Sequence, residues 1–426
     1  MLKPWKYFGV RCFSQRPLPI SSEEFQARRA SLVHVGKPEN PSTYGVSVAA
    51  IVKGASRTSY ALDVYYPFRQ SSYFRYLCGV NIADSLLYVT EKKSVLFTKE
   101  DLQKHSGVDQ VLGLKEFESF IAKEIGDKHI LIELDDFKDS PLMELFVKRP
   151  NSKLIPIVDK IRWRKSSAEL DLMRETCRIG SAAMNSMIKK CKMAPNEAHL
   201  SGRLEFEYRR RGAIGSAYPP VVAAGSRAQT IHYLDADQDI SPGDCVLVDA
   251  GCDLDGYVSD ITRCFPISGK FNDHQKVLYD VLEDVHNDCL NYVENVRPLK
   301  LNELYFTMLK SMAKHLTAAN FFDKELAKEE TINLCDELCP HHVSHYLGMD
   351  VHDTFGISRS IELLSNVIIT VEPGIYCRKG IEHVRKEFHG IGFRIEDDVL
   401  ITKTGSEILT STCVRGSNEI EKLMNN

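Results

Sequence analysis

Four carboxylate residues in the second half of the sequence stand beside short apolar runs. Asp249 and Glu372 each end a mostly apolar run, and Asp260 and Glu396 lie within similar stretches. Such runs predict buried strands, and a carboxylate buried at the end of a strand is unfavourable unless it has a partner. The four residues therefore indicate a buried site in which carboxylates share a partner of opposite charge.

One turn can bring the first two of these carboxylates together. Asp255-Gly256 is a strong signal for a two-residue hairpin turn, and it lies between Asp249 and Asp260. A hairpin closed by this turn pairs Asp249 with Thr262 and places Asp260 on the same face. Two carboxylates this close require a cation between them or a shared proton. Taken in isolation, the pair would more simply be two solvated aspartates beside a turn.

A histidine cluster lies between the two pairs of carboxylates. Positions 341, 342, 345 and 352 hold four of the 14 histidines of the chain. A single histidine is usually a satisfied core residue, whereas a cluster among strand-end carboxylates is typical of metal sites and catalysis. Four carboxylates and one imidazole provide enough hard ligands for two divalent ions, and they favour Mn²⁺, with cobalt or iron as alternatives. Two ions about 3.5–4 Å apart lower the pKa of water and polarise a carbonyl, which is hydrolytic chemistry.

The elements that must position these residues fall into two regions. Residues 21–160 alternate short strand-like runs with helical stretches, which indicates an α/β domain. Strands are predicted at 46–52, 85–89, 93–97 and 129–133, helices at 24–32 and 114–124, and a connecting stretch at 150–158. Residues 161–426 combine helices with strand segments rich in glycine and aspartate, which indicates an α+β domain with an antiparallel sheet. Helices are predicted at 167–192, 197–211, 273–295 and 301–317, and strands at 244–266, 365–378 and 390–403.

Three sequence blocks around the carboxylates resemble a known family. They are Val248-Asp249-Ala250-Gly251-Cys252, Ser259-Asp260-Ile261-Thr262-Arg263 and Leu347-Gly348-Met349-Asp350-Val351-His352-Asp353. The blocks are similar to those of the pita-bread metallopeptidases, and within this family to aminopeptidase P. The block Tyr66-Pro67-Phe68-Arg69-Gln70 resembles the N-terminal domain of that subfamily, and the likeness extends over residues 21–420. It implies an α/β N-terminal domain at 21–160, followed by an α+β pita-bread catalytic domain at 161–426.

The resemblance also implies a role for each residue of the site. Asp249 would bind one of two divalent metal ions, while His345 and Glu372 would bind the other. Asp260 and Glu396 would bridge the two ions. Glu372 would in addition take up a proton and pass it to the leaving nitrogen. The expected substrate-side residues are His232, His341, His352, Arg394 and Tyr376, of which Arg394 could equally support a ligand and Tyr376 could equally serve in packing.

The implied activity is that of an aminopeptidase that prefers proline in the second position of its peptide substrates. This preference rests on the resemblance, because no proline pocket can be identified in the sequence. A dipeptide-specific prolidase would have the same ligands. A pita-bread protein without activity, serving in binding, is a third alternative, and the presence of all five ligands disfavours it. Members of the family are often dimers or tetramers, so a homo-oligomer is expected.

The first 20 residues resemble a mitochondrial targeting segment. They contain Lys3, Lys6, Arg11 and Arg16, and no acidic residue precedes Glu23. A matrix enzyme that trims imported proteins is therefore expected, with a cytoplasmic enzyme as the alternative. The net charge of −4 indicates no nucleic-acid partner, and no apolar run approaches the roughly 20 residues that span a membrane.

Overall fold

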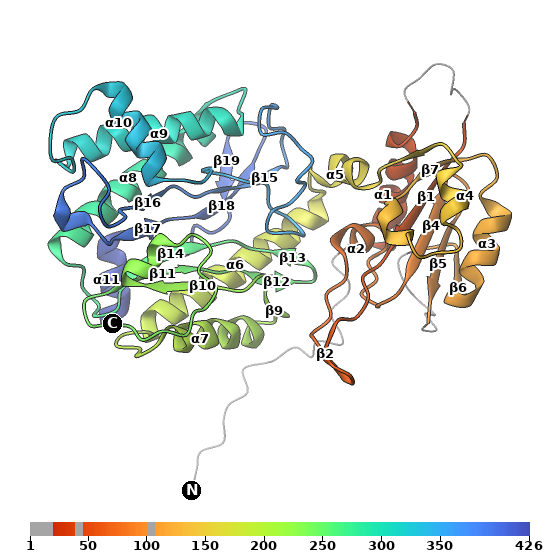
Figure 1. The fold of residues 1–426 in the computed structure, drawn as a ribbon, viewed down its shortest axis with the longest axis horizontal. Coiled ribbons are helices and arrows are strands. Elements are labelled where there is room, and N and C mark those ends of the chain that lie inside the picture. Colours follow the sequence, from red (N-terminus) through yellow and green to blue (C-terminus); the bar gives the residue numbers. More distant parts are fainter. Residues whose placement is uncertain (1–19, 39–45, 100–106) are drawn as a thin grey trace, which may run out of the picture. The chain divides into compact units, whose positions relative to one another are not determined.

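The chain divides into two compact units, Met1–Arg162 and Trp163–Asn426, shown as ribbons in Figure 1. The computed structural model describes residues 20–38, 46–99 and 107–426. Residues 1–19 of the predicted targeting segment lie outside the described residues. No helix in the described part of the chain combines the length and the apolar character that a membrane crossing requires.

The first unit is built on a mixed sheet of six strands in the order β6-β5-β4-β1-β7-β8. These strands are β1 (Val48–Lys53), β4 (Leu86–Thr90), β5 (Ser94–Thr98), β6 (Gln110–Gly113), β7 (His129–Leu131) and β8 (Asn151–Ser152). Its helices are α1 (Ser22–Val35), α2 (Ser72–Cys78), α3 (Phe117–Glu124), α4 (Met143–Val147) and α5 (Ile155–Arg162), and a separate hairpin joins β2 (Ser59–Ala61) to β3 (Val64–Tyr65). The central strand β1 pairs antiparallel with β4 and parallel with β7. The predicted α/β character is confirmed.

One element of this unit differs from the prediction. The stretch 150–158, predicted as a connection, contains the beginning of helix α5. Pro156 lies in the first turn of this helix, where a backbone N–H has no partner within the helix and proline is therefore tolerated.

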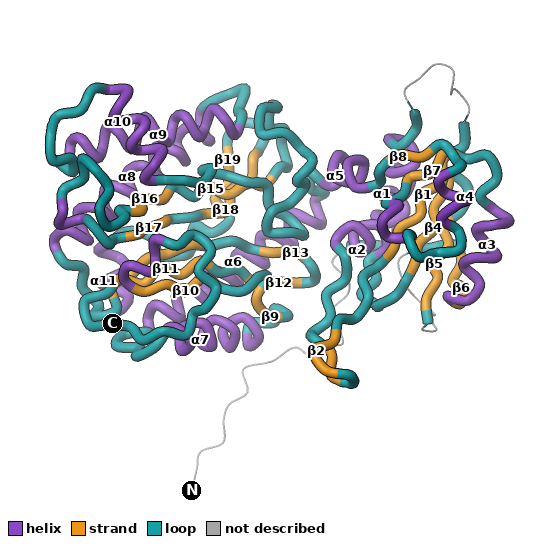
Figure 2. Tube along the Cα trace, viewed as in Figure 1, coloured by secondary structure: helices purple, strands orange, loops and turns teal. Residues whose placement is uncertain are grey.

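The second unit contains four small sheets, β10-β11-β14, β13-β12-β9, β15-β18-β19 and β16-β17, whose described pairs are antiparallel. The strands are β9 (Gly215–Ser216), β10 (Val221–Ala224), β11 (Cys245–Asp249), β12 (Cys252–Leu254), β13 (Tyr257–Val258), β14 (Thr262–Pro266), β15 (Ile368–Val371), β16 (Gly374–Tyr376), β17 (Gly392–Arg394), β18 (Asp397–Ile401) and β19 (Ser406–Ile408). The helices are α6 (Ser167–Lys190), α7 (Glu197–Arg210), α8 (Asp273–Asn295), α9 (Leu301–Ala318), α10 (Lys328–Leu338) and α11 (Ser417–Asn425). Helix α6 packs against β12 and β13, and α7 packs against β9 and β10, whereas α8 packs against β15 and β17. The strands therefore lie between two groups of helices (Figure 2).

The long helices begin where the sequence provides a cap. Ser166 accepts a hydrogen bond from the backbone N–H of Glu169, and the Glu169 carboxylate accepts one from the backbone N–H of Ser166. Asn272 and Gln275 form the same arrangement at the start of α8. The four helices predicted in this unit are confirmed to within two residues at each end. Helices α10 and α11 were not predicted.

The structure confirms the register of the predicted hairpin between Asp249 and Asp260, but the chain follows a different path between them. Asp249 lies opposite Thr262, as predicted. However, the Asp255-Gly256 turn joins β12 to β13, which belong to a different small sheet from β11 and β14. The chain therefore leaves one sheet after Asp249 and returns to it at Thr262. This excursion places Asp260 in the loop that leads back into β14.

The excursion depends on a close backbone approach at Gly251, which gives a prediction for stability. A Cβ at this position would lie 1.6 Å from the backbone oxygen of Ser259, so alanine would force the two segments apart. We expect Gly251→Ala to reduce the free energy of unfolding by about 3 kcal/mol and to lower the thermal midpoint. As a control, Gly202→Ala adds a Cβ that meets no atom within 4 Å in helix α7, and it should stabilise by about 0.5–1 kcal/mol. Equal midpoints for the two variants would contradict the prediction.

Candidate active site

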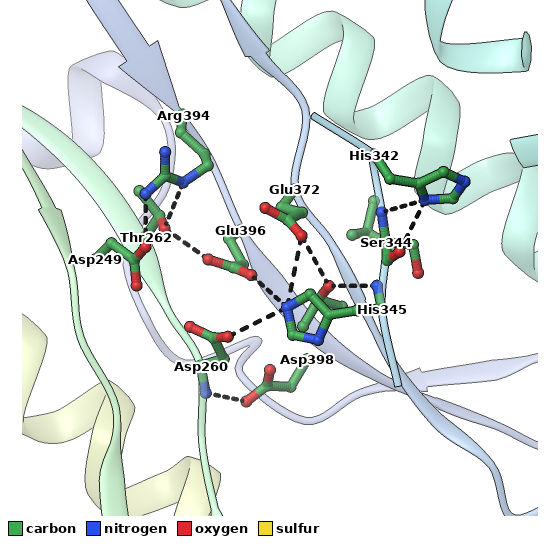
Figure 3. A network of polar contacts seen from close by, with 12 residues as sticks. Asp249, Asp260, Thr262, His342, Ser344, His345, Glu372, Arg394, Glu396 and Asp398 are labelled. Atoms are coloured by element: carbon green, nitrogen blue, oxygen red, sulfur yellow. Dashed lines mark hydrogen bonds and ion pairs between the residues drawn. The ribbon is translucent and has the colours of Figure 1, made fainter. Parts of the chain in front are cut away.

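The four carboxylates come from the ends of paired strands. Asp249 is the last residue of β11, and Asp260 precedes β14. Strands β11 and β14 are paired. Glu372 follows β15 and Glu396 precedes β18, and these strands pair with Val371 opposite Asp397. Because the two strands are neighbours, Glu372 at the end of β15 and Glu396 before β18 lie side by side. Figure 3 shows Asp260, Glu372 and Glu396 around the imidazole of His345, with Asp249 nearby beside Arg394.

The imidazole at the centre of the group is that of His345. Its Nε2 lies 3.4 Å from an oxygen of Asp260, 3.5 Å from one of Glu372 and 3.9 Å from one of Glu396. Its Nδ1 lies 3.1 Å from the backbone oxygen of Tyr346, which assigns the Nδ1–H as the donor of that hydrogen bond. Nε2 is thereby directed at the carboxylates, the orientation in which histidine binds a metal ion.

The electrostatics of this group fit a divalent cation. Asp260, His345 and Glu396 each offer a ligand atom, and these atoms lie within 4.8 Å of one another. Burial, followed by the charges of Asp260 and Glu372, raises the pKa of Glu396 well above its ordinary value. Burial opposes the charged form of His345, but its hydrogen bond to Asp260 and the charge of Glu372 outweigh this and raise its pKa to about 9. The carboxylates therefore favour positive charge among them, as a metal site of hard ligands does.

A chain of hydrogen bonds connects the carboxylates with the histidine cluster. Arg394 donates from Nη2 to Asp249 at 2.6 Å and from Nη1 to the Tyr376 hydroxyl at 2.6 Å. The Tyr376 hydroxyl lies 2.9 Å from Nε2 of His341, whose Nδ1 is 3.0 Å from a backbone oxygen. Arg394 is 2% exposed and fully engaged with these partners and with Thr262. Arg394 is therefore placed to hold the side chains of Asp249 and Tyr376 in position.

The predicted substrate-side histidines lie around one cleft. His232, His341 and His352 line a cleft of about 520 Å³ together with His345 and Glu372. The rings of His345 and His352 are 4.6 Å apart at an angle of 88°. Apolar side chains of Ile231, Phe355 and Ile357 and polar side chains of Ser358 and Arg359 complete the wall. The cleft thus combines imidazoles, apolar surface and one carboxylate of the proposed ligand set.

The structure adds three residues to the site that the sequence did not indicate. The Tyr218 hydroxyl is hydrogen-bonded to Asp260 and lies 2.7 Å from Asp249. Thr262 donates to Glu396 at 2.6 Å, and Asp398 accepts a hydrogen bond from the backbone N–H of Asp260 at 3.0 Å. Tyr218 lies 31 and 42 residues from its two partners, in a loop without a strand or helix signal, so no spacing could connect it with them.

The position of Tyr218 gives a prediction for metal binding. Its hydroxyl is the donor shared by two proposed ligands, so Tyr218→Phe removes a hydrogen bond that orients them. We expect the dissociation constant for Mn²⁺, measured by titration calorimetry, to rise about 10-fold. Tyr208→Phe is the control, since the hydroxyl of this buried tyrosine has no hydrogen-bond partner among the described residues. The prediction is wrong if both variants bind Mn²⁺ as the unaltered chain does.

A fold of small antiparallel sheets with a buried carboxylate and histidine site fits the class of metallopeptidases. The sequence matches Metallopeptidase family M24 over residues 171–403 and the Aminopeptidase P, N-terminal domain over residues 25–105. The chain belongs to metallopeptidase family M24. The predicted pita-bread architecture and the predicted class, a metallo-aminopeptidase, are thereby confirmed.

Individual relatives cover nearly the whole chain. Xaa-Pro aminopeptidase 3 of Homo sapiens is 32% identical over 439 residues, 95% of this chain and 86% of the relative. Intermediate cleaving peptidase 55, mitochondrial, of Arabidopsis thaliana is 33% identical over 435 residues, 96% of this chain and 84% of the relative. The structure of Zn substituted E. coli Aminopeptidase P in complex with product matches with a TM-score of 0.86 and 30% identity, over 95% of this chain and 98% of that one.

Proposed function

We propose that this chain is a dinuclear, manganese-dependent aminopeptidase that removes the N-terminal residue from peptides with proline in the second position. The observation that carries the proposal is the convergence of Asp249, Asp260, His345, Glu372 and Glu396 beside one cleft. The names of several relatives, Xaa-Pro aminopeptidase in Homo sapiens and Escherichia coli among them, support the class of substrate.

Five residues would hold the metal ions. Asp249 is proposed for one ion, His345 and Glu372 for the other, and Asp260 and Glu396 for a bridging position. The short distances from Nε2 of His345 to three of the carboxylates support this assignment. A set of four carboxylates and one imidazole favours Mn²⁺ over softer ions. When bound, the two ions would polarise the scissile carbonyl and lower the pKa of the attacking water.

Glu372 is proposed to handle the proton. Its carboxylate lies on the wall of the cleft, 3.5 Å from His345 and 3.7 Å from His341. From this position it can accept a proton from the attacking water and donate it to the leaving nitrogen. The main chain holds Glu372 in place, because its backbone N–H donates to the oxygen of Val343 at 2.9 Å.

The other cleft residues are proposed to recognise the substrate. A bond to proline is a tertiary amide without an N–H, so its recognition depends on shape and on hydrogen bonds to the carbonyl oxygen. His232, His341 and His352 would donate to the developing negative charge or hold the prolyl ring. Tyr376 would fix the orientation of His341, and Arg394 that of Asp249.

The N-terminal segment and the relatives together support a proposal for where the protein acts. The basic segment at 1–20 and the mitochondrial relative from Arabidopsis thaliana support a matrix enzyme that trims imported proteins. A dimer or tetramer is proposed as its assembled form. A reporter fused to residues 1–40 should enter mitochondria, and an even cytosolic distribution would favour the cytoplasmic alternative.

Peptide assays with Mn²⁺ test the function. We expect rapid release of alanine from Ala-Pro-Pro, slower release from the dipeptide Ala-Pro, and loss of both activities after chelation of the metal. Ala-Ala-Pro is the matched control, since it changes only the second residue. Cleavage of the dipeptide alone would identify a prolidase. An absence of hydrolysis with all three peptides would favour the alternative of a binding protein without activity.

A further inference from the structure

A buried ion pair lies directly behind the histidine cleft. Nζ of Lys165 is 2.9 Å from Oδ2 of Asp353, and each side chain is 1% exposed. The two residues are 188 positions apart in the sequence, Lys165 just before helix α6 and Asp353 just after His352. Burial of both charges is unfavourable, and such a pair contributes little to stability compared with apolar residues of the same volume. Its presence beside the cleft therefore suggests a role other than stabilising the fold.

The segment from Tyr346 to Asp353 folds around the carboxylate of this pair. The backbone N–H of Asp353 donates to the oxygen of Tyr346 at 2.9 Å, and that of Asp350 donates to the Asp353 side chain at 3.3 Å. Gly348 leaves the space that the pair occupies. A Cβ at Gly348 would lie 2.7 Å from Oδ2 of Asp353 and 2.9 Å from Cε of Lys165. The loop and the ion pair are thus fitted to each other.

Thr354, the residue that follows Asp353, has a strained backbone. Thr354 has a φ of 44° and is 1% exposed. A β-branched residue in the left-handed region is strained, and it persists only where its surroundings hold it. Asp353, fixed by Lys165, is the adjoining residue, so the ion pair is placed to maintain this conformation.

We propose that Lys165 and Asp353 are positioning residues that hold His352 in the cleft. His352 precedes Asp353 and is itself exposed to the cleft, where its ring packs edge-on against His345. The position of the His352 ring depends on the backbone of His352, and the Lys165–Asp353 pair holds this backbone at the following residue. Without Lys165 the carboxylate of Asp353 turns toward water, Thr354 relaxes, and the His352 ring moves. The inference rests on the proposed function, in which His352 contacts the substrate.

A double-mutant cycle tests whether Lys165 acts through His352. We expect Lys165→Met to lower kcat/KM for Ala-Pro-Pro about 10- to 100-fold, and Lys165→Arg to restore most of it. In the His352→Ala background, the same Lys165→Met substitution should change kcat/KM less than about 2-fold. Lys276→Met, at a partly buried lysine on helix α8 that is paired with Asp280, is the control and should leave activity unchanged. Equal losses in both backgrounds would overturn the proposal.

A second variant and a second readout keep the test independent of folding and of activity. If Lys165→Met does not fold, Gly348→Ala replaces it in the cycle, because it displaces the pair and keeps both charges. In either variant the bound Mn²⁺ per chain should stay unchanged, while amide hydrogen exchange of residues 346–354 should accelerate about 10-fold or more. Unaltered exchange in this segment overturns the positioning role. Failure of the unaltered chain to cleave Ala-Pro-Pro would instead contradict the proposed function.

Discussion

Glu396→Gln is expected to reduce kcat/KM for Ala-Pro-Pro by about 10³-fold or more. Glu396 is 2% exposed, accepts a hydrogen bond from Thr262 and faces His345 among three other carboxylates. Glutamine keeps the size of the side chain and removes its charge, so the proposed bridge between two cations is lost. Steady-state assays over a range of Mn²⁺ concentrations, together with the metal content of the purified protein, measure the effect.

The control for this substitution is Glu382→Gln. Glu382 is exposed, and the same change of chemistry there should leave kcat/KM and metal content unchanged. A Glu396→Gln protein with undiminished Mn²⁺-dependent activity would reject the assignment of Glu396 as a ligand. A loss of activity with normal metal content would restrict its role to the substrate side.

Arg263→Met is expected to reduce the free energy of unfolding by about 3–5 kcal/mol. The guanidinium is completely buried and donates to Asp397 at 2.7 Å, to the backbone oxygen of Glu396 at 2.6 Å and to that of Val414 at 2.7 Å. Methionine fills a similar volume but leaves the buried carboxylate of Asp397 with fewer partners, and it removes the donor to the backbone oxygens of Glu396, Cys413 and Val414. Urea unfolding of the metal-free protein measures the loss without a contribution from bound cations.

The matched control is Arg178→Met. Arg178 forms an ion pair with Glu175 three residues away on helix α6, and the two side chains are 58% and 41% exposed. Removal of such a surface pair should change stability by about 0.5 kcal/mol at most. If both substitutions shift the urea midpoint equally, the buried network around Asp397 does not stabilise the unit as its geometry indicates.

Much of the site could be predicted from local sequence patterns. Asp249 and Glu372 were found because a strand that is apolar on both faces and ends in a carboxylate is rare without a partner for the charge. The pairing of Asp249 with Thr262 was found because a two-residue turn between alternating segments fixes a register. The choice of His345 among four neighbouring histidines came from the family resemblance. In the structure it is the one that faces three carboxylates.

The remainder depends on contacts between distant parts of the chain. The break between β13 and β14 was missed because the backbone N–H of Asp260 donates to Asp398 instead of continuing the hairpin. These residues are 138 positions apart, and no periodicity relates them. Tyr218 was missed for the same reason. Helix α10 was missed because its 11 residues carry a weak pattern of their own, and packing against α9 stabilises them.

Arg263 also links the order of synthesis to the completion of the proposed metal site. The partners of its guanidinium, at positions 396, 397, 413 and 414, are synthesised long after Asp249 and Asp260 have left the ribosome. A nascent chain, or a product of a premature stop codon before residue 396, contains Asp249 and Asp260. It lacks Glu396 and the later residues that bind Arg263. Under the proposed function, the full set of five ligands would therefore come together only after residue 396 has been synthesised.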